Sequence, residues 1–298
     1  MDTVKKKAVI FGASQSGLAA KKSMEKNYHF SAFIDNDETK ADELVDNLPV
    51  YEPSRLSEID FDVVLVASEF AEQITSQLIV EYGIPADRIV TLSAHQIKPF
   101  HFADNARNRS NAEMILGVIS AHLQSAKIKY YVDAGTLLGI YRDSELIPWD
   151  DDLDFAVDAA ELEQLLVSLD AILAELRLVT GHEWRSSRLT AERTFGNVPH
   201  GGIRSIKLNA EGSSNSFPMV DFFLKYINKN IMDYSLSSRG IRMPSRYMTD
   251  RKKFIFKNRI ITIPSDTENY LAQHYGDDWR EPIMTWNLSM LKNSEVFK

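Results

Sequence analysis

The sequence predicts two domains, a parallel α/β domain over residues 1–100 and an α+β domain over residues 101–298. Three observations predict this division. Short, apolar, β-branched runs alternate with helical segments from residue 7 to residue 92, and such alternation is typical of a parallel sheet covered on both faces. The periodicity is lost around residues 93–111. Beyond that stretch, helices, strands and a hairpin follow without regular alternation.

The elements follow from the periodicity of apolar residues. In the first domain, strands are expected over residues 8–11, 30–34 and 63–67, each ending in turn or capping residues. In the second domain, helices are expected from residue 111 and over 159–176, where apolar side chains recur every three or four positions, with Asp158 and Glu161 as a capping box. Strands are expected over 130–132, 152–157, 203–208 and 219–224, and a hairpin over 254–264.

Composition excludes several classes of protein. The 298 residues are 44% hydrophobic and 26% charged, as expected for a globular protein. A net charge of −8 argues against broad nucleic-acid binding, which requires a cationic face. No run approaches the ~18 apolar residues of a membrane span, and the N-terminus shows no signal peptide. The absence of cysteine excludes disulfides and thiolate metal sites and is compatible with a cytoplasmic protein.

Two acids stand on one face of a predicted strand. In residues 152–157, Asp152 and Asp154 share one face while the residues between and after them are apolar. Carboxylates so close together repel one another, and a divalent cation such as Mg²⁺ or Mn²⁺ removes the repulsion. The alternative is that Asp150, Asp151 and Asp152 form a solvated acidic turn.

A third acid interrupts the most apolar strand of the second domain. An unpaired Asp221 would be costly there, so it requires either a metal or a cationic partner, and both remain open. Lys207, on the strand that leads toward Asp221, either points to the same site or faces solvent.

This arrangement, with Gly135-Thr136 opening a helix before the acids, resembles the DNA polymerase beta-like nucleotidyltransferase fold. The longer string GTLLGIYRDSELIPWDDDLDFAV, with YLAQHYGDDWREP near the C-terminus, resembles the LicD family, which includes the fukutin-like proteins. The resemblance covers roughly residues 110–286. It implies transfer of a phosphorylated alcohol, such as phosphocholine or a polyol phosphate, from a CDP-linked donor to a sugar hydroxyl of a glycan or glycolipid, with CMP leaving.

The resemblance also implies roles for residues. Asp152, Asp154 and Asp221 would bind the metal, with Asp150 and Asp151 as adjacent supports. Gly135 and Thr136 would meet the donor phosphate at the helix N-terminus. Arg142 would clamp that phosphate unless it is an ordinary surface arginine. Apart from the resemblance, the position of Asp133 at the end of the preceding strand makes it a candidate to accept the proton of the acceptor hydroxyl, unless it only caps a turn.

The first domain carries a glycine-rich fingerprint. Gly12, Ser14 and Gly17 follow a strand and open a helix, and Asp35 stands near the position of a ribose ligand. Ser14 replaces the middle glycine of that pattern. The domain resembles the Rossmann-like domains found beside bacterial sugar-modifying enzymes, which bind a nucleotide or nucleotide-sugar or only support assembly.

Other features have simpler interpretations. His182, His200 and His274 are expected at the surface or in loops. The basic run Arg251-Lys252-Lys253, with Lys257 and Arg259, indicates a solvated hairpin, or a contact with an anionic acceptor or with the inner face of a membrane. Three further functions remain open: a nucleotidyltransferase that releases pyrophosphate from an NTP, an oxidoreductase using NAD(P), and a non-catalytic assembly protein.

Overall fold

The computed structural model describes residues 5–68, 70–98, 100–211, 216–236, 238–284 and 286–297. The first four residues, on which part of the signal-peptide expectation depends, lie outside this range. The chain divides into two compact units. Unit 1 comprises residues 1–99 and 283–289, and unit 2 comprises residues 100–282 and 290–298. No helix in the described part of the chain has the length and apolarity that a bilayer crossing requires.

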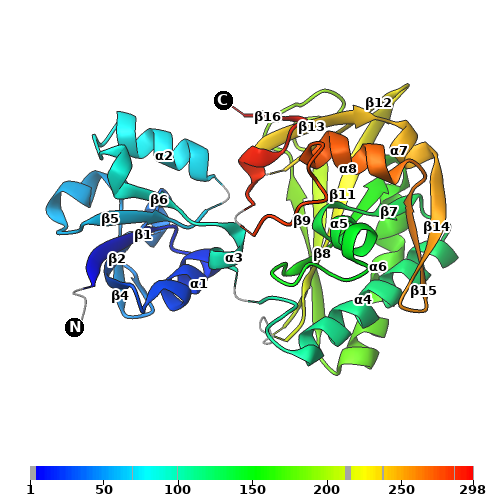
Figure 1. Ribbon diagram of the computed structural model, residues 1–298, viewed down its shortest axis with the longest axis horizontal. Coiled ribbons are helices and arrows are strands. Elements are labelled where there is room, and N and C mark those ends of the chain that lie inside the picture. The colour runs from blue at the N-terminus through cyan, green and yellow to red at the C-terminus, as the bar shows by residue number, and fades with distance from the viewer. Residues whose placement is uncertain are drawn as a thin grey trace. The chain divides into compact units, whose positions relative to one another are not determined.

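Unit 1 is a sheet with helices on both faces (Figure 1). Its strand order is β3-β4-β2-β1-β5-β6, and every pair is parallel except β3–β4. The strands are β1 (Lys6–Phe11), β2 (Tyr28–Ile34), β3 (Leu44–Val45), β4 (Leu48–Tyr51), β5 (Val63–Val66) and β6 (Ile89–Thr91). The helices are α1 (Gln15–Met24), α2 (Ala71–Val80) and α3 (Ala94–Ile97), with 3-10 turns at Glu38–Lys40, Pro53–Glu58 and Ala86–Arg88.

Two apolar cores explain why the strands of unit 1 are apolar on both sides. Ile10 and Leu65 pack toward α1 and α3, whereas Val9 and Val64 pack toward α2. A central parallel strand buried on both faces has no solvent side, so its residues do not alternate in polarity. The expectation of a parallel α/β N-terminal domain is confirmed.

Unit 2 is built on a mixed sheet with the strand order β16-β13-β12-β11-β10-β9, extended by β8 against β11 and by β7 against β8. Its strands are β7 (Tyr130–Val132), β8 (Asp152–Asp158), β9 (Trp184–Thr190), β10 (Ile203–Ala210), β11 (Met219–Asn228), β12 (Ile231–Ser235), β13 (Arg239–Pro244) and β16 (Ser294–Val296). β14 (Arg251–Phe256) and β15 (Arg259–Pro264) form the predicted hairpin. The helices are α4 (Ala106–Ser125), α5 (Ala134–Asp143), α6 (Leu162–Thr180), α7 (Arg246–Thr249) and α8 (Thr267–Tyr275), and a 3-10 turn lies at Ala159–Glu161. A second 3-10 turn, Leu288–Met290, begins in the part of the chain assigned to unit 1 and ends in the part assigned to unit 2.

The two long helices of unit 2, α4 and α6, pack against each other (Figure 1). α4 begins five residues before the predicted start because the Asn105 side chain caps it by accepting from the Asn108 N–H. The predicted capping box is wrong. Asp158 caps only the 3-10 turn, and Glu161, the N-cap of α6, makes no side-chain capping bond. Glu161 instead pairs with Lys129 at 3.0 Å.

The basic hairpin is partly neutralised within the molecule. Lys257 pairs with Glu145 and lies 3.4 Å from Glu113, and Arg251 is half-buried. The Ile255 and Ile260 side chains form an exposed cross-strand pair. These contacts fit the solvated hairpin; they supply no argument for a membrane surface.

Candidate active site

Three acids form one row across neighbouring strands of unit 2. Asp133 follows β7, and its N–H donates to the Asp154 carbonyl of β8 at 2.9 Å. Asp154 is in turn the register partner of Asp221 in the parallel pair β8–β11. All three residues are buried, with exposed fractions of 1%, 6% and 2%. The predicted alternation explains the row, because the opposite face of β8, formed by Leu153, Phe155 and Val157, is fully buried in the core.

Among the three acids of the row, Asp154 has the most strongly raised pKa. Its burial raises the pKa well above the ordinary value, and the charges of Asp152, Asp150 and Asp221 raise it further. Its backbone N–H donates to the Thr136 hydroxyl at 2.9 Å. The site therefore concentrates more negative charge than the surrounding protein compensates, and protons or a divalent cation would relieve it.

Asp221 has protein partners for both carboxylate oxygens. The Ser205 hydroxyl donates to one oxygen, and Lys207 Nζ lies 2.9 Å from the other. Burial nevertheless raises the pKa of Asp221, because it outweighs the lowering effect of Lys207 and Ser205. The sequence left open whether Lys207 points to the site or faces solvent, and in the structure its side chain points to the site. Asp221 thus has the cationic partner that was the alternative to a metal.

The acidic run before β8 forms a second cluster. Asp150, Asp151 and Asp152 are half-buried, and one carboxylate oxygen from each lies within 4.8 Å of the others. Among the described residues, this triplet is the group of three acids with that spacing. Asp152, Asp154 and Asp221 are neighbours by strand register but do not form such a group. Asp152 is the residue common to both sets, and hard carboxylate oxygens fit Mg²⁺ or Mn²⁺ in either one.

The Gly135-Thr136 turn lies directly against these acids. A Cβ atom on residue 135 would overlap the Asp150 carboxylate, so a side chain at this position would displace that carboxylate. The Thr136 hydroxyl accepts from Asp154 and lies 3.4 Å from the Asp152 carbonyl oxygen. The sequence therefore placed both residues beside the acids correctly, and their contact with a phosphate stays a prediction.

Arg142 lies in the last turn of α5, and only 7% of its side chain is exposed. The alternative of an ordinary surface arginine is therefore wrong. Its guanidinium forms a forked contact with the neighbouring Asp143, with Nη2 at 2.7 Å from the carboxylate. A donor phosphate would have to compete with Asp143 for this fork.

Asp133 is placed as a buried anchor. Its carboxylate pairs with Lys225 Nζ at 2.7 Å and accepts bonds from the Tyr270 hydroxyl and the Ala134 N–H. Burial raises the pKa of Asp133, but the Lys225 cation, His274 and the hydrogen bonds from Lys225 and Tyr270 together lower it more, so the net shift is downward. A buried, fully engaged carboxylate has little access to an acceptor hydroxyl. The helix-capping alternative is present in the structure, and the role of proton acceptor stays a prediction that this burial disfavours.

Sequence reasoning missed the partners of this anchor. Lys225 is fully buried. The signal available in the sequence was its position in an apolar strand, on the same face as Asp221. His274 was expected at the surface and is instead buried, with 3% exposure between the rings of Tyr234 and Tyr270. Burial lowers the pKa of His274 to about 4.

The glycine-rich turn of unit 1 has the expected backbone. Gly12 adopts a φ of +117°, and a Cβ on Gly17 would overlap the Gly12 carbonyl, so both positions require glycine. Ser14 is the N-cap residue of α1 but makes no side-chain capping bond. The Asp35 carboxylate accepts from the Ala13 N–H at 2.8 Å and pairs with Lys40, so its bonds are made within the domain.

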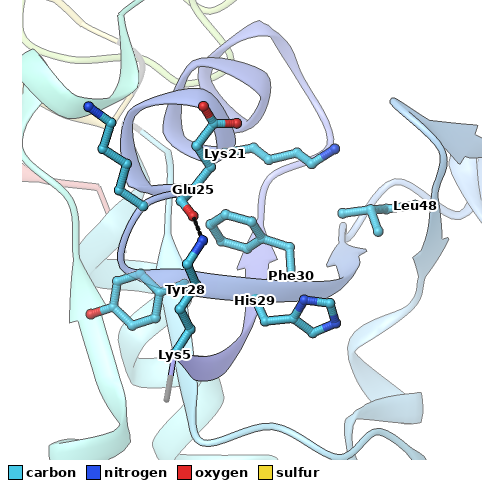
Figure 2. Close-up of a pocket in the computed structure, with 8 residues that line it drawn as sticks. Lys5, Lys21, Glu25, Tyr28, His29, Phe30 and Leu48 are labelled. Atoms are coloured by element: carbon cyan, nitrogen blue, oxygen red, sulfur yellow. Dashed lines mark hydrogen bonds between the residues drawn. The ribbon is translucent and has the colours of Figure 1, made fainter. Parts of the chain in front are cut away.

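A basic pocket of about 500 Å³ lies elsewhere in unit 1 (Figure 2). Figure 2 shows Lys5 reaching the Glu25 carbonyl across it, beside Tyr28 and Phe30. Lys5 directly precedes β1, Glu25 follows α1, and Tyr28 and Phe30 lie in the first half of β2, whereas the glycine-rich turn and Asp35 follow the ends of those strands. The pocket therefore does not coincide with the fingerprint.

Comparisons with known proteins match two separate segments of the chain, one toward each end. Residues 127–266 match the family model described as LicD/FKTN/FKRP, nucleotidyltransferase domain. Residues 4–90 match the model described as C2185-like, N-terminal.

Relatives share only part of their length with this chain. Ribitol-5-phosphate transferase FKTN of Homo sapiens is 22% identical over 182 residues, covering 60% of this chain and 35% of that protein. Uncharacterized protein RP689 of Rickettsia prowazekii (strain Madrid E) is 31% identical over 86 residues, covering 28% of this chain and 32% of that protein. The chain thus spans about a third of the length of these curated relatives.

Among solved structures, UDP-D-quinovosamine 4-dehydrogenase from Vibrio fischeri is 23% identical and covers 30% of this chain and 79% of its own, with a TM-score of 0.25. The family assignment therefore depends on the sequence, and the resemblance of the acidic motif is confirmed. Residues 127–266 of this chain therefore resemble the nucleotidyltransferase domain of the LicD/FKTN/FKRP family.

Proposed function

We propose that this protein is a metal-dependent phosphotransferase. It moves a phosphorylated alcohol, such as phosphocholine or a polyol phosphate, from a CDP-linked donor to a sugar hydroxyl of a surface glycan or glycolipid and releases CMP. The observation that carries the proposal is the buried row of acids inside the matched family domain. A relative over this region is named a ribitol-5-phosphate transferase. We propose that unit 2 has a nucleotidyltransferase-type fold.

The acids supply the site for the cation. Asp152 and Asp154 would bind it, with Asp221 as third ligand and with Asp150 and Asp151 adjacent. When bound, Mg²⁺ or Mn²⁺ would neutralise charge on the donor diphosphate. The uncompensated charge that raises the pKa of Asp154 supports this assignment.

The Lys207 pairing of Asp221 is compatible with a ligand role, since each carboxylate oxygen can accept more than one bond.

The other residues would bind and orient the reactants. Gly135 and Thr136, at the N-terminus of α5, would direct backbone N–H groups to the donor phosphate. Arg142 would add a cationic fork once Asp143 releases it. The half-buried Asp150 and Asp151 have the access to an acceptor hydroxyl that Asp133 lacks. Gly12, Ser14, Gly17 and Asp35 would bind a nucleotide or nucleotide-sugar in unit 1.

The test is CMP release from CDP-choline, CDP-ribitol and CDP-glycerol with Mg²⁺ or Mn²⁺. Asp152→Ala and Asp154→Ala should abolish release without lowering the temperature of thermal unfolding. Asp158→Asn is the matched control, because Asp158 lies on the same strand and face, is buried, and caps a turn that asparagine also caps. Unchanged turnover in both alanine variants would refute the metal site.

A second function is favoured by the description of the family model as a nucleotidyltransferase domain. In that case the protein would transfer an NMP from an NTP to a small molecule or protein. Release of pyrophosphate from an NTP, with no CMP from any CDP-alcohol, would identify this function.

A further inference from the structure

A fully buried lysine lies next to the acid row and contacts Asp133. Lys225 is 0% exposed and follows Asp221 on the same face of β11, two alternations further along the strand. Its Nζ lies 2.7 Å from an oxygen of Asp133 and 3.0 Å from the ring centroid of Tyr234. A buried cation is costly without a partner, so the Asp133 carboxylate and this ring hold it in place.

Asp133 connects the elements that surround the site. Its carboxylate receives Lys225 from β11 and the Tyr270 hydroxyl from α8, and its carbonyl oxygen accepts from the Leu137 N–H in α5 at 2.9 Å. Its own N–H donates to Asp154 in β8. One residue therefore ties the beginning of α5 to two strands and to helix α8.

The backbone directly after Asp133 is strained. Ala134 adopts a φ of +43°, a region that residues with a side chain rarely occupy. Such a conformation persists only where the surroundings enforce it. The next two residues are Gly135, against the Asp150 carboxylate, and Thr136, whose hydroxyl accepts from Asp154. The strained turn thus leads straight into the part of α5 that touches the acids.

We propose that Lys225 and Tyr270 are positioning residues. By holding Asp133 from two sides, they fix the first turn of α5 against β8, so that Gly135, Thr136 and Asp154 keep one relative geometry. The kinetic part of this inference rests on the proposed function, and the structural part does not.

The sharpest variant is Tyr270→Phe, which removes the hydroxyl at Asp133 and keeps the ring. Tyr247→Phe is the matched control, because Tyr247 packs edge-on against Tyr270 and its hydroxyl contacts Arg246 instead. We expect kcat for CMP release to fall on the order of 10-fold in Tyr270→Phe, with KM for the donor unchanged, because small misplacements of reacting groups reduce turnover. The control should retain the wild-type kcat.

Hydrogen exchange tests the same inference without turnover. The Leu137 and Asp154 amides should exchange faster in Tyr270→Phe than in Tyr247→Phe at equal thermal stability. If both exchange rates and kcat match the control, the proposal is overturned. If the wild-type protein releases no CMP from any donor, the proposed function fails, and the exchange rates still decide the positioning role.

A third variant separates positioning from charge compensation. Lys225→Met alone leaves Asp133 charged and unpaired, whereas Lys225→Met combined with Asp133→Asn removes both charges and keeps the cap. The double variant should unfold at a temperature closer to wild type than the single variant, and its kcat should remain reduced. A full return of kcat would show that the pair only balances charge and would overturn the proposal.

Discussion

Replacing Asp154 by asparagine removes one negative charge from the acid row while keeping nearly the same shape. Asp154 and Asp221 face each other across the parallel pair β8–β11, and both are buried. Adjacent strands lie about 4.8 Å apart, so two ionised carboxylates there are separated by about 5 Å. At an effective dielectric constant of about 20, two unit charges at this distance repel by about 3 kcal/mol.

The net gain is smaller because Lys207 already offsets part of the charge on Asp221. We therefore expect Asp154→Asn to stabilise the metal-free protein by about 1–3 kcal/mol. For a protein of this size, each kcal/mol raises Tm by about 2–4 °C. The same substitution should abolish turnover, so stability and activity are expected to change in opposite directions.

The assay is thermal unfolding of both proteins in EDTA and in a Mg²⁺ titration. Wild type should gain about 2.7 kcal/mol at a Mg²⁺ concentration 100 times its Kd, and the variant should gain much less. The pH dependence has a defined sign. Since the folded pKa of Asp154 is raised, its stabilising contribution is present at low pH and is lost as pH rises through that pKa. Wild type in EDTA should therefore lose stability with rising pH more steeply than the variant.

Two outcomes would refute this reasoning. The first is an Asp154→Asn protein that is less stable than wild type in EDTA above neutral pH, since the carboxylate would then be stabilising when ionised. The second is an equal Mg²⁺-dependent rise of Tm in both proteins, since the cation would then bind elsewhere. The Asp158→Asn protein, which keeps the row intact, should behave as wild type in both measurements.

Three further predictions concern neighbouring positions. His274→Phe should reduce the loss of stability between pH 7 and pH 4 by about 3 kcal/mol, measured by denaturant unfolding, because the folded pKa of about 4 lies below the unfolded value near 6.5. An identical pH profile would contradict it. Lys207→Met should destabilise the metal-free protein by about 2 kcal/mol, less than a fully buried pair because the lysine is 24% exposed, and Mg²⁺ should restore part of the loss by replacing the cation at Asp221. A loss that Mg²⁺ does not restore would argue against a cation there. Gly135→Ala should reduce turnover at least about 10-fold by displacing the Asp150 carboxylate, with a change in stability below about 1 kcal/mol, and wild-type turnover would show that this contact is unimportant.

The faces of the individual elements could be predicted from the sequence. Alternation along β8 placed Asp152 and Asp154 on one side and apolar residues on the other, because side chains of a strand alternate by geometry alone. The length of the acidic motif indicated the family whose model matches residues 127–266. Glycines at positions 12 and 17 marked the tight turn into α1, since Gly12 has a positive φ and a Cβ on Gly17 would overlap the Gly12 carbonyl.

The pairing of distant residues was decided by the tertiary structure. Sequence placed Asp221 on an apolar strand but could not show that β11 lies parallel to β8, or that Lys207 lies opposite Asp221. The burial of His274 could not be predicted, because the sequence of a short helix does not show whether a given polar residue faces water or the core. Local periodicity fixes which face a side chain occupies, whereas its partner depends on which strands and helices meet. For this reason the partners of Asp133, which are Lys225 and Tyr270, could not be predicted from the sequence.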